Sequence, residues 1–180
     1  MNSSIVMNDM RKSMSFIEVA KPIIRNLIGG NIMTVEGSDC EVCQMLDTRC
    51  GTDYFQIYSA DDVVYGVASR VQYGYPYNTF TVRKRRASGA MTEYDKRRMA
   101  IKSGGVYPFL TMQTYVDTNT REINSLAVMK TTDLFDFIEK GYADTNHTKH
   151  DKHGQASFYV AHWNKIKECG YQIFVYEKAA

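Results

Sequence analysis

Alternating side chains predict that the middle of the chain is extended. Successive side chains of a β-strand point to opposite faces, so alternation assigns each residue to a face. Over residues 63–72, one predicted face carries Val63, Tyr65, Val67, Ser69 and Val71. The opposite face carries Val64, Gly66, Ala68, Arg70 and Gln72. Residues 79–85 continue the pattern with Phe80 and Val82 on one face, and residues 73–77 predict a turn between the two strands.

Apolar residues at helical spacing predict helices on both sides of these strands. A capping box over residues 15–18 precedes a helix that two glycines would end after residue 28. A second capping box, over residues 92–95, precedes a helix that would end before Gly104. Thr131 or Thr132 is predicted to cap a third helix, and residues 164–169 a short fourth one.

The remaining segments complete the predicted fold. Further strands are expected over residues 32–35, 53–58, 107–116, 122–129, 158–163 and 171–177. Residues 142–155 are polar and predict a loop. Residues 1–12 predict a flexible N-terminal arm, and residues 13–180 one globular domain. The order of elements predicts an α/β fold, with α+β as the alternative, built on a mixed central sheet flanked by helices.

Composition indicates a soluble globular protein. The chain has 180 residues, of which 44% are hydrophobic and 23% charged. No run of about 18 apolar residues occurs, so no membrane span is expected. The first residues lack the apolar core of a secretory signal, so the cytoplasm is the expected location, where cysteines are thiols or metal ligands rather than disulfides.

Basic residues gather in one stretch although the net charge is only +2. Residues 63–102 hold nine of the 22 lysines and arginines, interleaved with aromatic rings. This pattern is typical of surfaces that bind a phosphate backbone and stack bases, so an anionic partner, most simply nucleic acid, is predicted. The alternative is a solvated sheet face on which arginine stems cover apolar surface. The predicted partner-binding residues are Arg70, Gln72, Tyr75, Tyr77, Arg83, Lys84, Arg85, Arg86, Lys96, Arg97 and Arg98.

One further pattern involves an acid at the start of a strand. Asp53 opens a predicted strand that follows a helix, and another strand and helix come next. This order resembles the restriction-endonuclease-like, or PD-(D/E)XK, nuclease superfamily. In that family an Asp and an acid-x-Lys pair hold Mg²⁺ and activate water. Asp53 would match the Asp, and Glu18 the helix acid that some members carry.

The acid-x-Lys pair is missing from this sequence. The corresponding strand positions are Ala68, Ser69 and Arg70, and arginine does not release a proton to act as a base. Glu93 and Lys96 on the following helix could replace the pair. The resemblance therefore implies either a restriction-endonuclease-like core that binds without catalysis and without a cofactor, or a Mg²⁺-dependent endonuclease that uses Asp53, Glu93 and Lys96.

Two sets of residues are candidate metal ligands. Cys40, Cys43 and Cys50 could supply three ligands for Zn²⁺, although a second CxxC pair is missing. Small buried thiols beside a turn are the alternative. The second set, His147, His150 and His153, would share one face of a helix, but the polar neighbours favour a loop.

Three hypotheses about function follow. The first is a small protein in the style of phages and mobile elements. It would engage nucleic acid or a nucleoprotein complex such as a host defence nuclease, in the manner of an anti-CRISPR inhibitor, without catalysis of its own. The second is the endonuclease, which requires the acids to converge on one metal position. The third is a structural or virion-associated protein, which predicts that the basic residues are divided between opposite faces.

Overall fold

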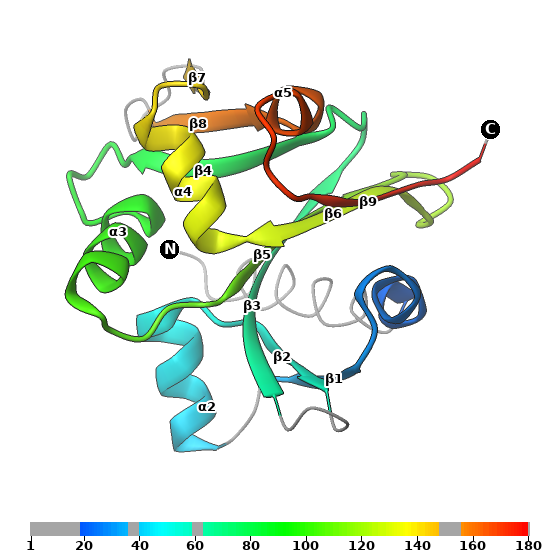
Figure 1. Cartoon of the computed structure of the whole chain (residues 1–180), viewed down its shortest axis with the longest axis horizontal. Coiled ribbons are helices and arrows are strands. Elements are labelled where there is room, and N and C mark those ends of the chain that lie inside the picture. Colours follow the sequence, from blue (N-terminus) through cyan, green and yellow to red (C-terminus); the bar gives the residue numbers. More distant parts are fainter. Residues whose placement is uncertain (1–18, 36–39, 59–62, 148–155, 180) are drawn as a thin grey trace.

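The strands form two sheets. The structure is a computed structural model that describes residues 19–35, 40–58, 63–147 and 156–179. Sheet A has the strand order β1-β2-β3-β5-β6-β9 and sheet B the order β4-β8-β7 (Figure 1). The strands of sheet A are Asn31–Thr34, Tyr54–Tyr58, Val63–Tyr73, Leu110–Val116, Ile123–Lys130 and Phe174–Glu177. The strands of sheet B are Thr79–Arg85 (β4), Ser157–His162 (β8) and Asp144–His147 (β7).

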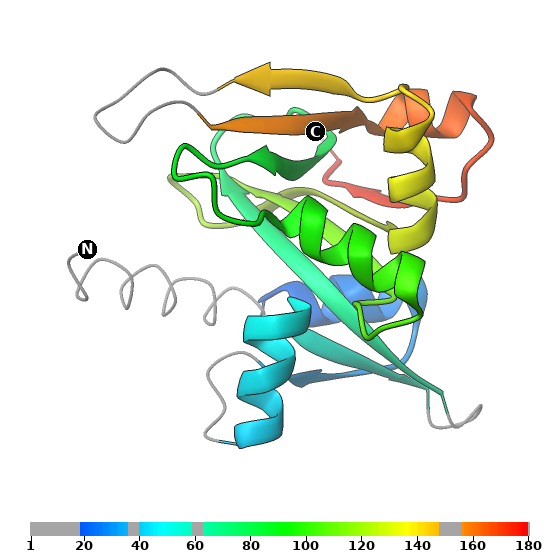
Figure 2. The same ribbon diagram turned by 90° about the vertical axis from the view of Figure 1, so that its left-hand side faces the viewer.

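Sheet A is mixed. Strands β3 and β5 run parallel, with Arg70 opposite Gln113, whereas the other neighbours in the sheet are antiparallel. Parallel neighbours require a crossover connection. Here the crossover contains β4 and the helix α3 (Glu93–Ser103), and α3 lies beside β3 (Figure 2). The predicted fold class, with a mixed sheet and flanking helices, is therefore confirmed.

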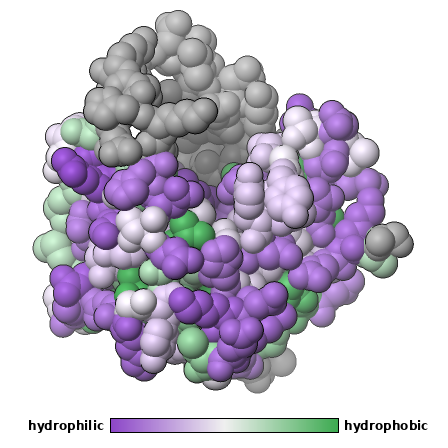
Figure 3. Space-filling view, turned by 90° about the horizontal axis from the view of Figure 1, so that it is seen from above, coloured by the Kyte–Doolittle hydropathy of each residue, from purple (hydrophilic) through white to green (hydrophobic). Residues whose placement is uncertain are grey.

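Apolar side chains form a core on each face of sheet A. On one face, Ala20 and Ile24 from the helix over residues 19–28 pack against Met112 of β5 and its neighbours. On the other face, Tyr115 packs with Trp163 and other residues of sheet B, α4 (Thr131–Glu139) and α5 (Trp163–Glu168). Figure 1 shows the helix over residues 19–28 on one side of sheet A, and sheet B with α4 and α5 on the other side. Where β7 and α5 lie, the described surface is mainly hydrophilic (Figure 3).

Several predicted elements are confirmed. Strand β4 has the predicted bounds, and β2, β3, β6 and α5 differ by a residue or two. The capping box of α3 is present: Thr92 Oγ1 accepts from the Asp95 backbone N–H, and Asp95 Oδ2 accepts from the Thr92 N–H at 2.9 Å. Between β1 and β2 lie a short helix, α2 (Glu41–Met45), and a π-helical turn, η1 (Leu46–Cys50).

Other predictions are wrong. Neither Thr131 nor Thr132 caps α4: the cap residue is Lys130, and the Thr131 hydroxyl bonds the Thr111 hydroxyl at 2.8 Å instead. The predicted loop over residues 142–155 contains strand β7, which pairs with β8. Trp163 begins α5 rather than ending the strand before it, and β9 begins at Phe174 rather than at residue 171. The predicted arm over residues 1–12 and the first capping box lie outside the described residues.

Candidate functional site

A cavity of about 270 Å³ lies between η1, β3, the end of β4 and α3. Two acidic side chains, Asp53 and Glu93, line it together with a larger number of basic ones. The basic residues are Arg49, Arg70, Arg86, Lys96 and Arg97. They come from four segments of the chain, so only the folded protein brings this excess of positive charge together. We refer to these seven residues as the arginine cavity.

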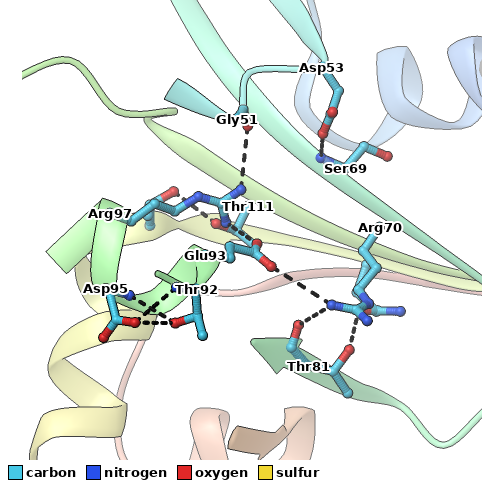
Figure 4. Close-up of polar contacts among 12 residues, drawn as sticks. Gly51, Asp53, Ser69, Arg70, Thr81, Thr92, Glu93, Asp95, Arg97 and Thr111 are labelled. Carbon is cyan, nitrogen blue, oxygen red and sulfur yellow. Dashed lines mark hydrogen bonds and ion pairs between the residues drawn. The ribbon is translucent and has the colours of Figure 1, made fainter. Parts of the chain in front are cut away.

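Glu93 organises the arginines of this cavity. It is the first residue of α3, directly after the N-cap residue Thr92 of the capping box, which fixes where the helix begins. Its carboxylate lies 2.6 Å from Arg97 Nη1, one helical turn later, and 3.8 Å from Arg70 Nη1 on β3. Figure 4 shows Glu93 between the two guanidinium groups. One carboxylate therefore orients two cations from different elements.

Arg97 is buried, with an exposed fraction of only 6%. Its Nη2 donates to the carbonyl of Gly51, 3.4 Å away, just after η1. Gly51 has a φ of 68°, and a Cβ there would lie 3.2 Å from Arg97 Nη2. Glycine thus serves both the left-handed backbone and the close approach of the guanidinium. Arg97 was predicted to lie on an exposed basic surface. In the structure it is a buried residue that lines the cavity.

Arg70 and Arg83 meet over one aromatic ring. Their guanidinium carbons lie 5.2 Å and 5.5 Å from the ring centroid of Phe158 on β8. Arg70 Nη1 also donates to the Thr81 carbonyl at 3.5 Å. Partial burial lowers the pKa of Arg83, and the nearby positive charges of Arg70 and Arg86 lower it further. The geometry at Phe158 therefore brings two cations, Arg70 and Arg83, close together.

Gln72 and Tyr77 line a second hollow, a groove of about 480 Å³ beside β4, β7 and β8. Thr81 belongs to this groove and contacts Arg70 of the arginine cavity, so the two hollows are neighbours. Tyr77 and Tyr75 form an edge-to-face pair with ring centroids 5.1 Å apart. They are 60% and 71% exposed, so both rings are accessible to a partner.

The structure divides the predicted partner-binding residues. Four line the arginine cavity and two the groove, and Arg83 lies with Arg70 over the ring of Phe158. Two basic residues are directed elsewhere: Lys84 donates to Thr145 Oγ1 at 3.3 Å, and Arg98 to Glu139 Oε1 at 2.7 Å. Arg85 is exposed and lines neither hollow.

Sequence reasoning missed Arg49 and Phe158, which lie outside the basic stretch over residues 63–102. No local pattern marks either residue, because both reach the site only through the tertiary fold.

The three residues of the endonuclease alternative, Asp53, Glu93 and Lys96, line the same cavity. Asp53 Oδ2 accepts from the backbone N–H of Ser69, and Glu93 is engaged by two arginines (Figure 4). Across residues 19–35, 40–58, 63–147 and 156–179, no three His, Cys, Asp or Glu side chains are grouped to hold a metal. The surplus of cations also opposes a divalent ion. Both carboxylates that line the cavity are thus already engaged by protein donors, and Glu18 lies outside the described residues.

The other candidate metal ligands are thiols and histidines. Cys40, Cys43 and Cys50 form no disulfide and none of them is buried, with Cys40 exposed at the start of α2, so the expectation of small buried thiols is wrong. Hydrogen bonds from the backbone and side chain of Cys43 lower the pKa of Cys40. His147 is exposed at the end of β7, and residues 150 and 153 lie outside the described part.

Comparisons with protein-family models, curated proteins and solved structures give no match to this chain. Within the residues that the structure describes, none of the helices has both the length and the apolar character to cross a bilayer.

Proposed function

We propose that this protein binds nucleic acid by its phosphate groups at the arginine cavity, without catalysis of its own. The observation that carries the proposal is the convergence of five basic side chains from four segments on one cavity with only two carboxylates. A structural protein has no need to gather like charges in a hollow, because they repel one another there. A bound anion relieves that repulsion.

The type and setting of the cations suit phosphate. A guanidinium is planar, stays charged and can donate two parallel hydrogen bonds to phosphate oxygens. Glu93 fixes Arg70 and Arg97 before any ligand arrives, so less side-chain entropy is lost on binding. Lys96 and Arg86 are exposed at the cavity and can meet a phosphate backbone that passes over it.

The test compares two double variants that remove the same charge. Arg86→Gln with Lys96→Gln changes the exposed cations of the arginine cavity. Arg98→Gln with Lys102→Gln changes two cations of α3 that pair with Glu139. Oligonucleotide binding is measured by fluorescence anisotropy over a salt series. We expect the first variant to bind more weakly and to lower the salt slope of log K by about 0.7–0.9 for each lost contact, and the second to resemble the wild type.

Two outcomes would contradict the proposal. Equal losses of affinity in the two double variants would mean that net charge alone drives binding. Circular dichroism verifies that both variants are folded. Cleavage of the oligonucleotide with Mg²⁺ or Mn²⁺ that Asp53→Asn abolishes would favour the endonuclease instead.

The wider role is also a proposal. A nucleoprotein complex, such as a host defence nuclease that the protein would inhibit, offers the same phosphates together with a protein surface. Pull-down from a host lysate, with and without nuclease treatment, separates the two kinds of partner. If the partner is an acidic protein surface, we expect the variant with Arg86→Gln and Lys96→Gln to associate with it more slowly, with little change in the dissociation rate. A structural or virion-associated protein with no nucleic-acid role predicts that neither double variant differs from the wild type in oligonucleotide binding.

A further inference from the structure

The groove beside the arginine cavity has a different chemical character. Most residues of its lining are neutral and polar, among them Gln72, Thr79, Thr81 and Asn146, but the surface that the lining exposes is mainly apolar. The acid Asp144 stands in it, 3.4 Å from His162 Nε2. No lysine or arginine lines the groove among the described residues. A phosphate is therefore disfavoured in the groove, whereas groups that donate and accept hydrogen bonds are suited to it.

Strand β3 contributes one residue to each of the two hollows. Arg70 lines the arginine cavity, and Gln72, two residues further on the same face of β3, lines the groove. Two residues along a β-strand span about 6.6 Å, so the two side chains are neighbours on this face. One face of β3 thus presents a phosphate-binding group and then an amide that can pair with a base.

Tyr77 adds an aromatic wall to the groove. Its ring is 60% exposed and is supported on one side by the edge-to-face contact with Tyr75. Stacking on exposed aromatic rings is how proteins hold the bases of single strands, since every base has a π-face. A base in a duplex is already stacked and paired, so it cannot enter such a groove without being flipped out.

We propose that the groove accepts unpaired bases, so that the ligand of this surface is single-stranded nucleic acid, with phosphates at the arginine cavity and bases against Tyr77. The inference rests on the proposed function, because the phosphates place the strand. The volume of the groove, about 480 Å³, lies within the roughly 300–1,000 Å³ of ligand pockets. The side-chain amides of Gln72 and Asn146 in its lining can form hydrogen bonds with base edges.

The test uses three labelled probes that differ in their bases: an oligothymidylate, an abasic strand of the same length and a duplex with the same number of phosphates. We expect the wild type to bind the oligothymidylate about tenfold more tightly than the abasic strand, as one stacked base provides. Tyr77→Ala should remove that difference, and Tyr77→Phe should keep it. Tyr73→Ala is the matched control, because the Tyr73 ring contacts the Arg121 guanidinium.

The outcomes separate this inference from the proposed function. Equal binding of the oligothymidylate and the abasic strand, or tighter binding of the duplex, would overturn the inference while leaving phosphate binding intact. Equal losses in Tyr77→Ala and Tyr73→Ala would also overturn it. Failure of the proposed function would instead appear as salt-independent binding of all three probes.

Discussion

Arg97 is a charged residue with almost no exposed surface, and its contacts give it a structural role. Its guanidinium joins Glu93 on its own helix to the Gly51 carbonyl after η1. The ion pair is not fully buried, because the Glu93 side chain is 30% exposed. Removing the arginine would still leave a carboxylate and a carbonyl without their main donor.

Replacing Arg97 by Met should therefore destabilise the fold. We expect the free energy of unfolding to fall by about 1–3 kcal/mol, the cost of leaving buried polar groups unsatisfied. Lys96→Met is the matched control, because Lys96 is exposed on the same helix, and a change within about 0.5 kcal/mol is expected there. Urea unfolding followed by circular dichroism measures both. Equal stability of the two variants would mean that Arg97 does not hold η1 and α3 together.

At this scale the sequence predicted which residue types gather but not where they point. Clustering of basic residues along the chain correctly suggested Arg70, Arg86, Lys96 and Arg97 as neighbours. It could not separate them from Lys84 and Arg98, whose partners Thr145 and Glu139 lie 61 and 41 residues away. Distant partners decide the direction of a long side chain, and no local pattern encodes them.

At the scale of elements, the start of α3 decides the position of the site. The capping box places Glu93 in the first turn and Lys96 and Arg97 in the next. Hydrogen bonds from the backbone and hydroxyl of Thr92 lower the pKa of Asp95. The lowered pKa means that the folded state favours the ionised carboxylate.

The contribution of Asp95 should therefore depend on pH with a defined sign. Because its folded-state pKa lies below its unfolded value of about 3.9, the stabilisation is complete above that pH and is lost as the pH falls through the folded-state pKa. Asp95→Asn should lower the free energy of unfolding by about 0.3–1 kcal/mol at pH 7, and the difference from wild type should vanish in strong acid. Urea unfolding over a pH series tests this. A difference that persists in acid would show that charge is not its cause.

Elements with local signals were predicted well, and those fixed by pairing were not. The α3 capping box and the alternation of β4 depend only on residues that are close together in the sequence, and both are confirmed. Strand β7 has no apolar alternation, because all four of its residues are exposed, and only its pairing with β8 makes it a strand. The division into two sheets also depends on long-range pairing, between residues 79–85 and 157–162.

At the scale of the whole molecule, one tyrosine links the two sheets. Tyr115 of β5 in sheet A is fully buried, and its hydroxyl meets Thr79 at the start of β4 in sheet B. It donates to the Thr79 carbonyl at 3.1 Å and lies 2.8 Å from Thr79 Oγ1. Burial raises the pKa of Tyr115, so it stays a neutral donor. The link matters for function because β3 and β4, which hold Arg70 and Arg83, belong to different sheets.

Tyr115→Phe tests that link. The change keeps the ring that packs on Trp163 but removes the hydroxyl. It leaves the buried Thr79 without its partner, so we expect the free energy of unfolding to fall by about 1–3 kcal/mol.

Tyr65→Phe is the control. Tyr65 stacks on Phe109 on the opposite face of sheet A, and its hydroxyl makes no hydrogen bond within the described residues. This substitution should change the free energy of unfolding by at most about 0.5 kcal/mol. Urea unfolding of both variants gives the comparison. If sheet B also positions Arg83 beside Arg70, Tyr115→Phe should weaken oligonucleotide binding under conditions where it is still folded, whereas Tyr65→Phe should not. Unchanged binding and stability in Tyr115→Phe would mean that the apolar core alone holds the two sheets, and with them the arginine cavity and the groove, in place.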